Sequence, residues 1–147
     1  MIDFMEEAIK QAEIALKHDE VPIGAVIVKD GKIIAKGSNK REKTQNALMH
    51  AEIIAIKKAC RKLKSWRLDG CTIFVTLEPC PMCSGAIANA RIARLVYACK
   101  EKSSGDSLCE KILSSTRLNH KVEIIYDEKY SEKCSRILSE FFKGKRK

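Results

Sequence analysis

The chain has 147 residues, of which 45% are hydrophobic and 32% charged, and this balance is typical of one globular domain with a buried core. No apolar run is long enough to cross a membrane, and the acidic N-terminal residues are unlike a secretory or organellar leader. We therefore expect a cytoplasmic protein with no membrane partner. The net charge of +9 favours a polyanionic partner such as nucleic acid, although a generally basic surface explains it equally well.

The first predicted elements are a helix and a hairpin. Apolar residues recur at helical spacing over residues 3–18, and Asp3 followed by Glu6 resembles a capping box. Two apolar strands, at 23–29 and 32–37, flank an Asp-Gly pair, which is a strong signal for a hairpin.

A polar loop at 38–49 follows, and the rest of the chain alternates helices with strands. The helices are expected at 50–63, 81 to 89 or 91, 108–113 and 128–143. The strands are expected at 71–77, 93–98 and 122–126. Gly144 is expected to end the last helix, and Phe142 to face inward. This order predicts an α/β fold of three layers, in which helices cover both faces of a central five-stranded mixed sheet.

Seven cysteines bear on the redox compartment. Their odd number and irregular spacing make a poor disulfide framework, so reduced thiols in a cytoplasmic protein fit better. Cys80 and Cys83 form a pair with metal-binding spacing. The others are interpreted as small buried hydrophobic residues: Cys60, Cys71, Cys99, Cys109 and Cys134.

The segment Glu78-Pro79-Cys80-Pro81-Met82-Cys83 organises the chemistry of the chain. Pro81 suits the first position of a helix, so a helix is expected to begin there. Both sulfurs would then converge beyond the helix N-terminus, where the exposed amides and the helix dipole favour the thiolate form that binds metal. Two thiolates do not complete a zinc site, so further ligands are required.

The motif His50-Ala51-Glu52 offers the next ligand. Residues two apart do not face each other in mid-helix, but side chains of the first turn can both reach over the helix end. A site of His50, Cys80 and Cys83 with one open position is a catalytic type of zinc site, in which the metal activates water. Glu52 is then better suited to carrying protons beside the metal than to binding it.

A closed, structural zinc site is the alternative. It needs a fourth ligand, for which His120, Cys60 and Cys71 are the candidates. Structural sites of this kind usually show two pairs of closely spaced ligands, whereas this sequence has one. A structural site would also leave Glu52 without a role.

The pattern H-x-E followed by P-C-x-x-C is the signature of zinc-dependent nucleobase deaminases. On these motifs the sequence resembles the cytidine/deoxycytidylate deaminase superfamily and, within it, the bacterial tRNA-specific adenosine deaminases. The resemblance runs from about Phe4 to Phe142. Its landmarks are Glu20-Val21-Pro22-Ile23-Gly24-Ala25-Val26, Gly37-Ser38-Asn39, His50-Ala51-Glu52-Ile53, Trp66-Arg67-Leu68, Val75-Thr76-Leu77-Glu78-Pro79-Cys80, Ala90-Arg91-Ile92, Leu118-Asn119-His120-Lys121-Val122-Glu123 and Phe141-Phe142.

The resemblance implies one zinc-dependent deaminase domain over residues 1–147, with a basic tail at 143–147 and one zinc ion per subunit of a homodimer. It implies hydrolytic deamination of adenosine to inosine at the wobble position of a tRNA anticodon stem-loop, typically of an arginine tRNA. Zinc-bound hydroxide would attack C6 of the flipped base, and Glu52 would transfer the protons.

The resemblance also implies contacts with that nucleotide. Asn39 is expected to hydrogen-bond it, while Ile23 and Leu77 form apolar walls. The Ala51 amide is expected to hold the base edge, and Glu101 to touch a neighbouring ribose. Simpler explanations exist for two of them, since asparagine is common in loops and isoleucine in strand cores.

Two segments depart from the common family pattern, Asn46-Ala47-Leu48-Met49 and Cys99-Lys100-Glu101, and the second contains the expected ribose contact, Glu101. The basic residues expected to meet phosphate groups are Lys100, Lys102, Lys143, Lys145, Arg146 and Lys147.

Two other functions compete with tRNA deamination. One is deamination of a free base or nucleotide, of the guanine or cytosine type, on the same fold. The other is a catalytically silent subunit that only binds RNA. The charge of +9 and the basic tail favour a tRNA substrate, and Glu52 argues against a silent subunit because binding alone requires no proton carrier.

Overall fold

The computed structural model describes residues 1–101 and 107–145. The strands are β1 (Gly24–Lys29), β2 (Lys32–Ser38), β3 (Thr72–Val75), β4 (Arg94–Tyr97) and β5 (Glu123–Tyr126). The helices are α1 (Phe4–Lys17), α2 (Arg41–Thr44), α3 (Ala51–Leu63), α4 (Pro81–Asn89), α5 (Leu108–Leu113) and α6 (Ser131–Lys145), with a 3₁₀ turn, η1 (Glu128–Tyr130), before α6. Lys102, Arg146 and Lys147, expected to meet phosphate, lie outside the described residues.

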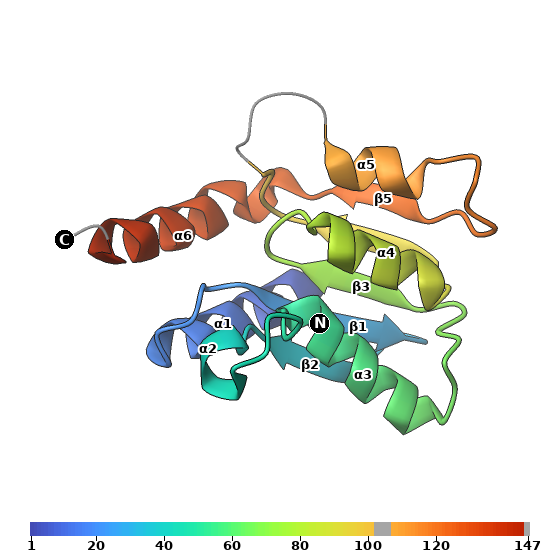
Figure 1. The fold of residues 1–147 in the computed structure, drawn as a ribbon, viewed down its shortest axis with the longest axis horizontal. Coiled ribbons are helices and arrows are strands. Elements are labelled where there is room, and N and C mark those ends of the chain that lie inside the picture. The colour runs from blue at the N-terminus through green and yellow to red at the C-terminus, as the bar shows by residue number, and fades with distance from the viewer. Residues whose placement is uncertain (102–106, 146–147) are drawn as a thin grey trace.

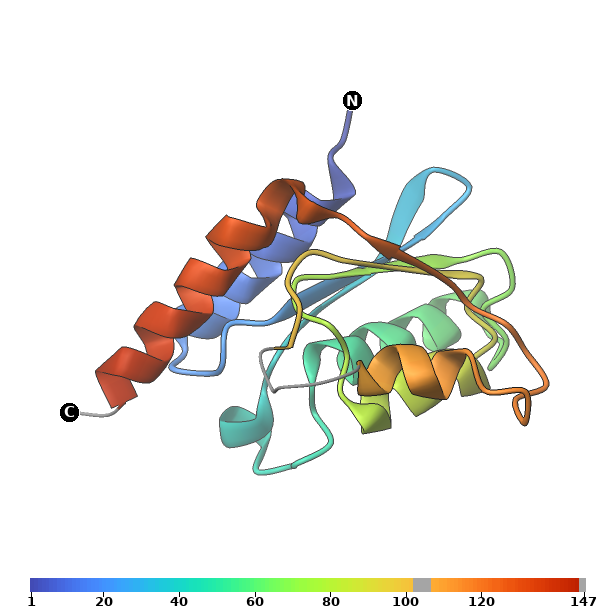
Figure 2. The ribbon, with the colours of Figure 1, turned by 90° about the horizontal axis from the view of Figure 1, so that it is seen from above.

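The strands form one mixed sheet in the order β2-β1-β3-β4-β5. β1 runs antiparallel to both β2 and β3, whereas β3, β4 and β5 are parallel to one another. The predicted hairpin is confirmed, and its turn has positive φ at Asp30 and Gly31 (51° and 75°), as a tight hairpin turn requires. Helices α1 and α6 lie side by side on one face, and α3, α4 and α5 cover the other (Figures 1 and 2). The predicted three-layer α/β fold is therefore confirmed.

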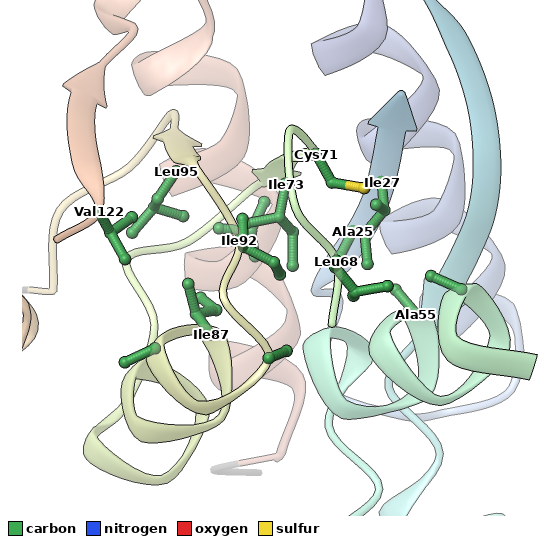
Figure 3. Packing of buried hydrophobic residues seen from close by; sticks show 14 of the residues in the cluster. Ala25, Ile27, Ala55, Leu68, Cys71, Ile73, Ile87, Ile92, Leu95 and Val122 are labelled. Carbon is green, nitrogen blue, oxygen red and sulfur yellow. The ribbon is translucent and has the colours of Figure 1, made fainter. Parts of the chain in front are cut away.

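Each face of the sheet has its own core. The larger core lies beneath α3, α4 and α5, where Leu68, Ile73 and Ile87 are fully buried (Figure 3). The smaller core lies beneath α1 and α6 and joins Met5 and Ile9 to strand residues. Burying each such side chain contributes roughly 1.5–3 kcal/mol, so both helical layers are held mainly by apolar contact.

Two glycines let helices approach the hairpin closely, one on each face. A Cβ atom at Gly24 would lie 2.1 Å from the carbonyl oxygen of Ala8 in α1. A Cβ atom at Gly37 would lie 2.2 Å from the carbonyl oxygen of Ala51 in α3. No side chain fits at either distance, so the two helix backbones rest directly on the two strands.

The cysteines and the first cap agree with expectation except at two residues: Cys60 is not buried, and the Glu6 carboxylate of the expected capping box accepts the Tyr130 hydroxyl. All seven cysteines are free, and four of the five outside the metal motif are buried, whereas Cys60 is partly exposed. The Asp3 carboxylate caps α1 by accepting hydrogen bonds from the amides of Met5 and Glu6, at 3.1 and 3.2 Å. In the described part of the chain, no helix is long and apolar enough to span a membrane.

The predictions for the last helix were wrong at both ends. The helix begins later, at Ser131, and it continues through Gly144 to Lys145. Gly144 keeps a helical backbone, because glycine permits a helix end without requiring it. Phe142 is 46% exposed, since the C-terminal half of α6 projects beyond the sheet (Figure 1). The polar loop at 38–49 also contains an unpredicted short helix, α2.

Candidate metal centre

The two metal motifs begin adjacent helices on one face of the sheet. His50 is the N-cap of α3, and Cys80 is the N-cap of α4, both with extended backbone. Pro81 occupies the first turn of α4, as its fixed φ and missing amide hydrogen favour. Neither N-cap side chain makes a capping hydrogen bond, so the imidazole and the thiol are directed to each other instead.

The three predicted ligands lie together. His50 Nδ1 is 3.6 Å from Cys80 Sγ and 3.5 Å from Cys83 Sγ, and the three ligand atoms all lie within 4.8 Å of one another. Zinc bonds of about 2.3 Å to sulfur and 2.0–2.1 Å to nitrogen, at tetrahedral angles, place these atoms about 3.6 Å apart. The donor set and its spacing therefore fit a zinc ion with one remaining position.

The closed, four-ligand alternative finds no support among the described residues. His120 Nε2 lies 2.7 Å from the carbonyl oxygen of Ile92, so this ring nitrogen already has a hydrogen-bond partner outside the cluster. Cys71 is fully buried in the larger core, and Cys60 Sγ contacts the carbonyl oxygen of Trp66 at 3.9 Å. In the segments that the structure describes, only His50, Cys80 and Cys83 form a cluster of three metal-binding side chains.

The cluster favours a thiolate at Cys80. A hydrogen bond from the Cys83 thiol, followed by one from His50, lowers the pKa of Cys80 to about 4. The pKa of Cys83 is raised correspondingly, because its thiol donates that hydrogen bond, and the pKa of His50 is raised by its bond with Cys80. A negative charge is therefore already stable where a cation would bind.

Glu52 lies in the first turn of α3 and is 4% exposed. Burial raises the pKa of its carboxyl group to about 7, and the charge on Cys80 acts in the same direction. A group with this pKa is both protonated and deprotonated in substantial amounts near neutral pH, as a proton carrier requires. Its side chain also hydrogen-bonds with Cys83, so it lies against the metal ligands.

Two residues expected to contact substrate border the metal side of the molecule. A pocket of about 360 Å³, the Cys80 pocket, is lined by both Cys80 and Glu101. Ala51 is fully buried between His50 and Glu52 in the chain, and it follows directly on the first ligand.

The other three residues expected to contact substrate do not line the Cys80 pocket. Asn39 is buried, donates its backbone amide to the carbonyl oxygen of Ile23 at 3.2 Å, and lines a separate pocket of about 470 Å³. Ile23 itself is partly buried and packs against both cores. Leu77 lines a third pocket of about 500 Å³, the Phe142 pocket, together with Glu101 and Phe142. The five substrate contacts stay predictions.

Sequence reasoning missed a buried carboxylate that holds the loop before α3. Glu20 is 2% exposed, and its two oxygens accept the amides of Glu42 and Lys43 at 3.0 and 2.8 Å. These amides belong to the first turn of α2, whose N-cap residue, Lys40, makes no side-chain cap. The signal available was the absence of a capping residue at Lys40, but its remote replacement could not be identified from the sequence.

A second missed carboxylate lies beside the metal ligands. Glu78 is 7% exposed and accepts hydrogen bonds from the Glu101 amide, at 3.0 Å, and from the Ser107 hydroxyl. Arg41 of α2 was likewise placed in an undifferentiated loop, yet its positive charge lies near enough to His50 to oppose slightly the rise in pKa that the bond with Cys80 causes. The contacts of Glu20 and Glu78 join distant parts of the chain, which is why the sequence did not reveal them.

Known proteins are similar to this chain over nearly its whole length. Residues 2–146 match the family model of the MafB19-like deaminases. The tRNA-specific adenosine deaminase of Bacillus subtilis (strain 168) is 43% identical over 145 residues, which are 98% of this chain and 89% of that protein. The enzyme of the same name from Streptococcus pyogenes serotype M18 (strain MGAS8232) is 47% identical, over 95% of this chain and 88% of its own. The chain belongs to the tRNA-specific adenosine deaminases. It is therefore a hydrolytic deaminase, and the silent-subunit alternative is set aside.

Solved structures of two kinds of deaminase resemble this chain. A structure from studies of A-to-I editing by tRNA:A34 deaminases superposes with a TM-score of 0.85, at 38% identity, over 92% of this chain and 98% of that one. The guanine deaminase of Bacillus subtilis superposes with a TM-score of 0.64, at 34% identity, over 97% of this chain and 91% of that one.

Proposed function

We propose that this deaminase converts adenosine to inosine at the wobble position of a tRNA anticodon stem-loop, typically that of an arginine tRNA. The observation that carries the proposal is the buried Glu52 carboxyl group against the cluster of His50, Cys80 and Cys83. Membership of the tRNA-specific adenosine deaminases directs this chemistry to adenosine in tRNA. The overall reaction consumes water and releases ammonia.

His50, Cys80 and Cys83 would hold one zinc ion. Zinc bound by such a ligand set lowers the pKa of water to about 7 and so supplies a nucleophile at neutral pH. Glu52 takes up one proton of the attacking water on its carboxylate and delivers it to the ring nitrogen of the base. It then passes the second water proton, from the hydroxyl group now on C6, to the amine, which leaves as ammonia. A carboxyl pKa of about 7 suits both uptake and release.

The expected contacts complete the substrate site. Asn39 hydrogen-bonds the flipped nucleotide, Ile23 and Leu77 provide apolar walls, the Ala51 amide holds the base edge, and Glu101 meets a neighbouring ribose. Support for Glu101 comes from its place in the Cys80 pocket. Support for Leu77 comes from the Phe142 pocket, which adjoins the Cys80 pocket because Lys100 and Glu101 line both.

Basic and aromatic side chains around the Phe142 pocket suit an RNA strand. Lys100 and Lys143 line this pocket together with the exposed ring of Phe142. Lysines neutralise phosphates, and an aromatic ring provides a stacking surface for a base. Lys145 is a weaker candidate, since its ammonium group already lies 2.5 Å from the Asp19 carboxylate.

The proposal extends to the oligomeric state and the location of the enzyme. The enzyme is proposed to act in the cytoplasm as a homodimer, with each subunit forming one domain over residues 1–147 and holding one zinc ion. Measuring the mass of the protein in solution tests the homodimer.

Deamination of free guanine is the second candidate, because the guanine deaminase of Bacillus subtilis shares the fold at 34% identity. The identities of 43% and 47% to tRNA-specific enzymes and the charge of +9 favour RNA. A small uncharged base would gain nothing from a strongly basic surface.

A substrate panel tests the proposal directly. The zinc-loaded protein is incubated with an anticodon stem-loop that has adenosine at the wobble position, with the same loop carrying guanosine there, and with free adenosine, guanine, cytosine and cytidine. Ammonia release and nucleoside analysis are the readouts. We expect inosine from the first RNA alone. Activity on a free base with none on RNA would overturn the proposed substrate.

A further inference from the structure

The Glu78 side chain lies between the metal ligands and the chain that follows β4. It precedes Cys80 by two residues, and its backbone amide donates to the carbonyl oxygen of Cys99 at 2.8 Å. This bond continues the pairing of β3 with β4 beyond the sheet. This hydrogen bond therefore holds the Glu78 backbone next to the metal motif and so limits where its side chain can lie.

Both carboxylate oxygens of Glu78 are occupied by donors from this following segment. One accepts the Glu101 amide at 3.0 Å, and the other accepts the Ser107 hydroxyl. The Ser107 oxygen in turn accepts the Glu110 amide at 3.0 Å and so caps α5. The Tyr97 hydroxyl also donates to the Glu110 carboxylate, at 3.3 Å. One buried carboxylate thus holds residue 101 and the start of α5 to the metal motif.

The residues held in this way form one wall of the Cys80 pocket. Cys80 and Glu78 line this pocket together with Glu101, Ser107 and Glu110. A buried carboxylate is costly unless its oxygens accept hydrogen bonds, so its energy depends on this arrangement staying intact.

We propose that Glu78 is a positioning residue for RNA binding: it fixes Glu101 and Ser107 at a set place relative to Cys80, and thereby shapes the wall of the pocket that meets the substrate. This inference rests on the proposed function, since the substrate is the RNA. Glu78 neither binds the metal nor transfers a proton in this role, because both its oxygens are engaged by Glu101 and Ser107.

The chemistry of the contact predicts a graded response to substitution. Glu78→Ala removes both acceptors. Glu78→Gln keeps one carbonyl oxygen to accept the Glu101 amide. Its new NH₂ group can donate a hydrogen bond to the Ser107 hydroxyl oxygen once that hydroxyl rotates. Glutamine should therefore restore most of the positioning that alanine removes, although it lacks the negative charge.

The experiment measures kcat and KM on the anticodon stem-loop, together with zinc content, for the wild type, Glu78→Ala, Glu78→Gln and Ser107→Ala. Loss of a hydrogen bond to a charged group at a binding site should raise KM about tenfold in Glu78→Ala, with kcat within about threefold and zinc retained. Ser107→Ala should show a smaller rise, and Glu78→Gln should recover most of the loss. A fall in kcat with unchanged KM, or equal loss of zinc in both Glu78 variants, would overturn the proposal.

Amide hydrogen exchange gives a readout that does not depend on turnover. The Glu101 amide should exchange faster in Glu78→Ala than in the wild type, whereas amides of α1 should not change. Unchanged exchange at Glu101 would contradict the positioning role even if the enzyme edits tRNA. Conversely, a wild type inactive on every RNA would refute the proposed function while leaving this test valid. If Glu78→Ala does not fold, Ser107→Ala alone decides, because it removes one partner and leaves Glu78 in place.

Discussion

Helices α1 and α3 pack on opposite faces of the β1–β2 hairpin in the same manner, yet only α3 carries residues of the metal centre. Each lies on a glycine so closely that an added Cβ atom would come within 2.1 Å of α1 at Gly24, or 2.2 Å of α3 at Gly37. The contact with α3 involves the carbonyl oxygen of Ala51, between His50 and Glu52. Close packing therefore stabilises the fold on one face and also sets the position of the reactive groups on the other.

Removing a metal ligand should have the largest effect. Cys83→Ala deletes one of the two sulfur ligands on the α3–α4 face, so zinc content should fall from one ion per chain to near zero and deaminase activity should be lost. Metal analysis and turnover measure this. Cys134→Ala is the matched control, since Cys134 of α6 is likewise a buried, free cysteine, on the other face. A Cys83→Ala protein that keeps zinc and turns over substrate would show that the cluster is not the metal centre.

Glu52→Gln should come next, because it removes the proton carrier and keeps its size. Turnover should fall by roughly 10²–10⁴-fold, the usual contribution of a general acid–base, while zinc and RNA binding persist. The control is Glu6→Gln, which changes a first-turn glutamate of α1 in the same way. Comparable turnover in wild type and Glu52→Gln would refute the role given to Glu52.

Substitutions at Gly24 and Gly37 test whether α1 and α3 differ in their contribution to the metal centre. Gly24→Ala and Gly37→Ala should each destabilise the protein by about 1–3 kcal/mol, because each forces a helix backbone away from its strand. Only Gly37→Ala should also weaken zinc binding and reduce kcat, since it displaces the first turn of α3. Denaturant unfolding and zinc titration separate these effects. Equal loss of zinc affinity in both variants would mean that α1 and α3 contribute alike to the site.

The features that could be predicted from the sequence are those with local causes. Pro81 after Cys80 indicates a helix start, and the Asp30-Gly31 pair indicates a hairpin turn, because each residue restricts its own backbone. The His50, Cys80 and Cys83 cluster followed from adding ligand chemistry to two predicted helix ends. For these elements the structure agrees with the prediction to within a few residues.

The features that could not be predicted depend on contacts between distant segments. Helix α2 is capped by Glu20, some twenty residues earlier, as the bonds to Glu42 and Lys43 show. The exposure of Phe142 depends on how far α6 extends past the sheet, which its own apolar pattern does not reveal. The contacts of Glu78 likewise require the end of β4 to lie beside the metal motif.

Lys143→Glu tests whether the α1–α6 face contributes to RNA binding. If Lys143 meets a phosphate, reversal should weaken stem-loop binding by about tenfold and reduce the slope of log affinity against log salt by about 0.7–0.9. Lys10→Glu, the same change on exposed α1, is the control. If both variants bind RNA like the wild type across the salt range, the Phe142 pocket is not the RNA surface that we propose.

Asp3→Ala should have the smallest effect, confined to stability. Loss of the α1 cap costs about 1 kcal/mol of unfolding free energy and should leave kcat, KM and zinc content unchanged. A hydrogen bond from the Tyr130 hydroxyl lowers the pKa of Asp3, so the folded state binds this proton less tightly than the unfolded chain. The difference between Asp3→Ala and wild type should therefore be complete at neutral pH and shrink as the pH falls through the carboxyl range. Denaturant titrations at neutral and acid pH measure it, and a difference that grows in acid would contradict the role of the ionised cap.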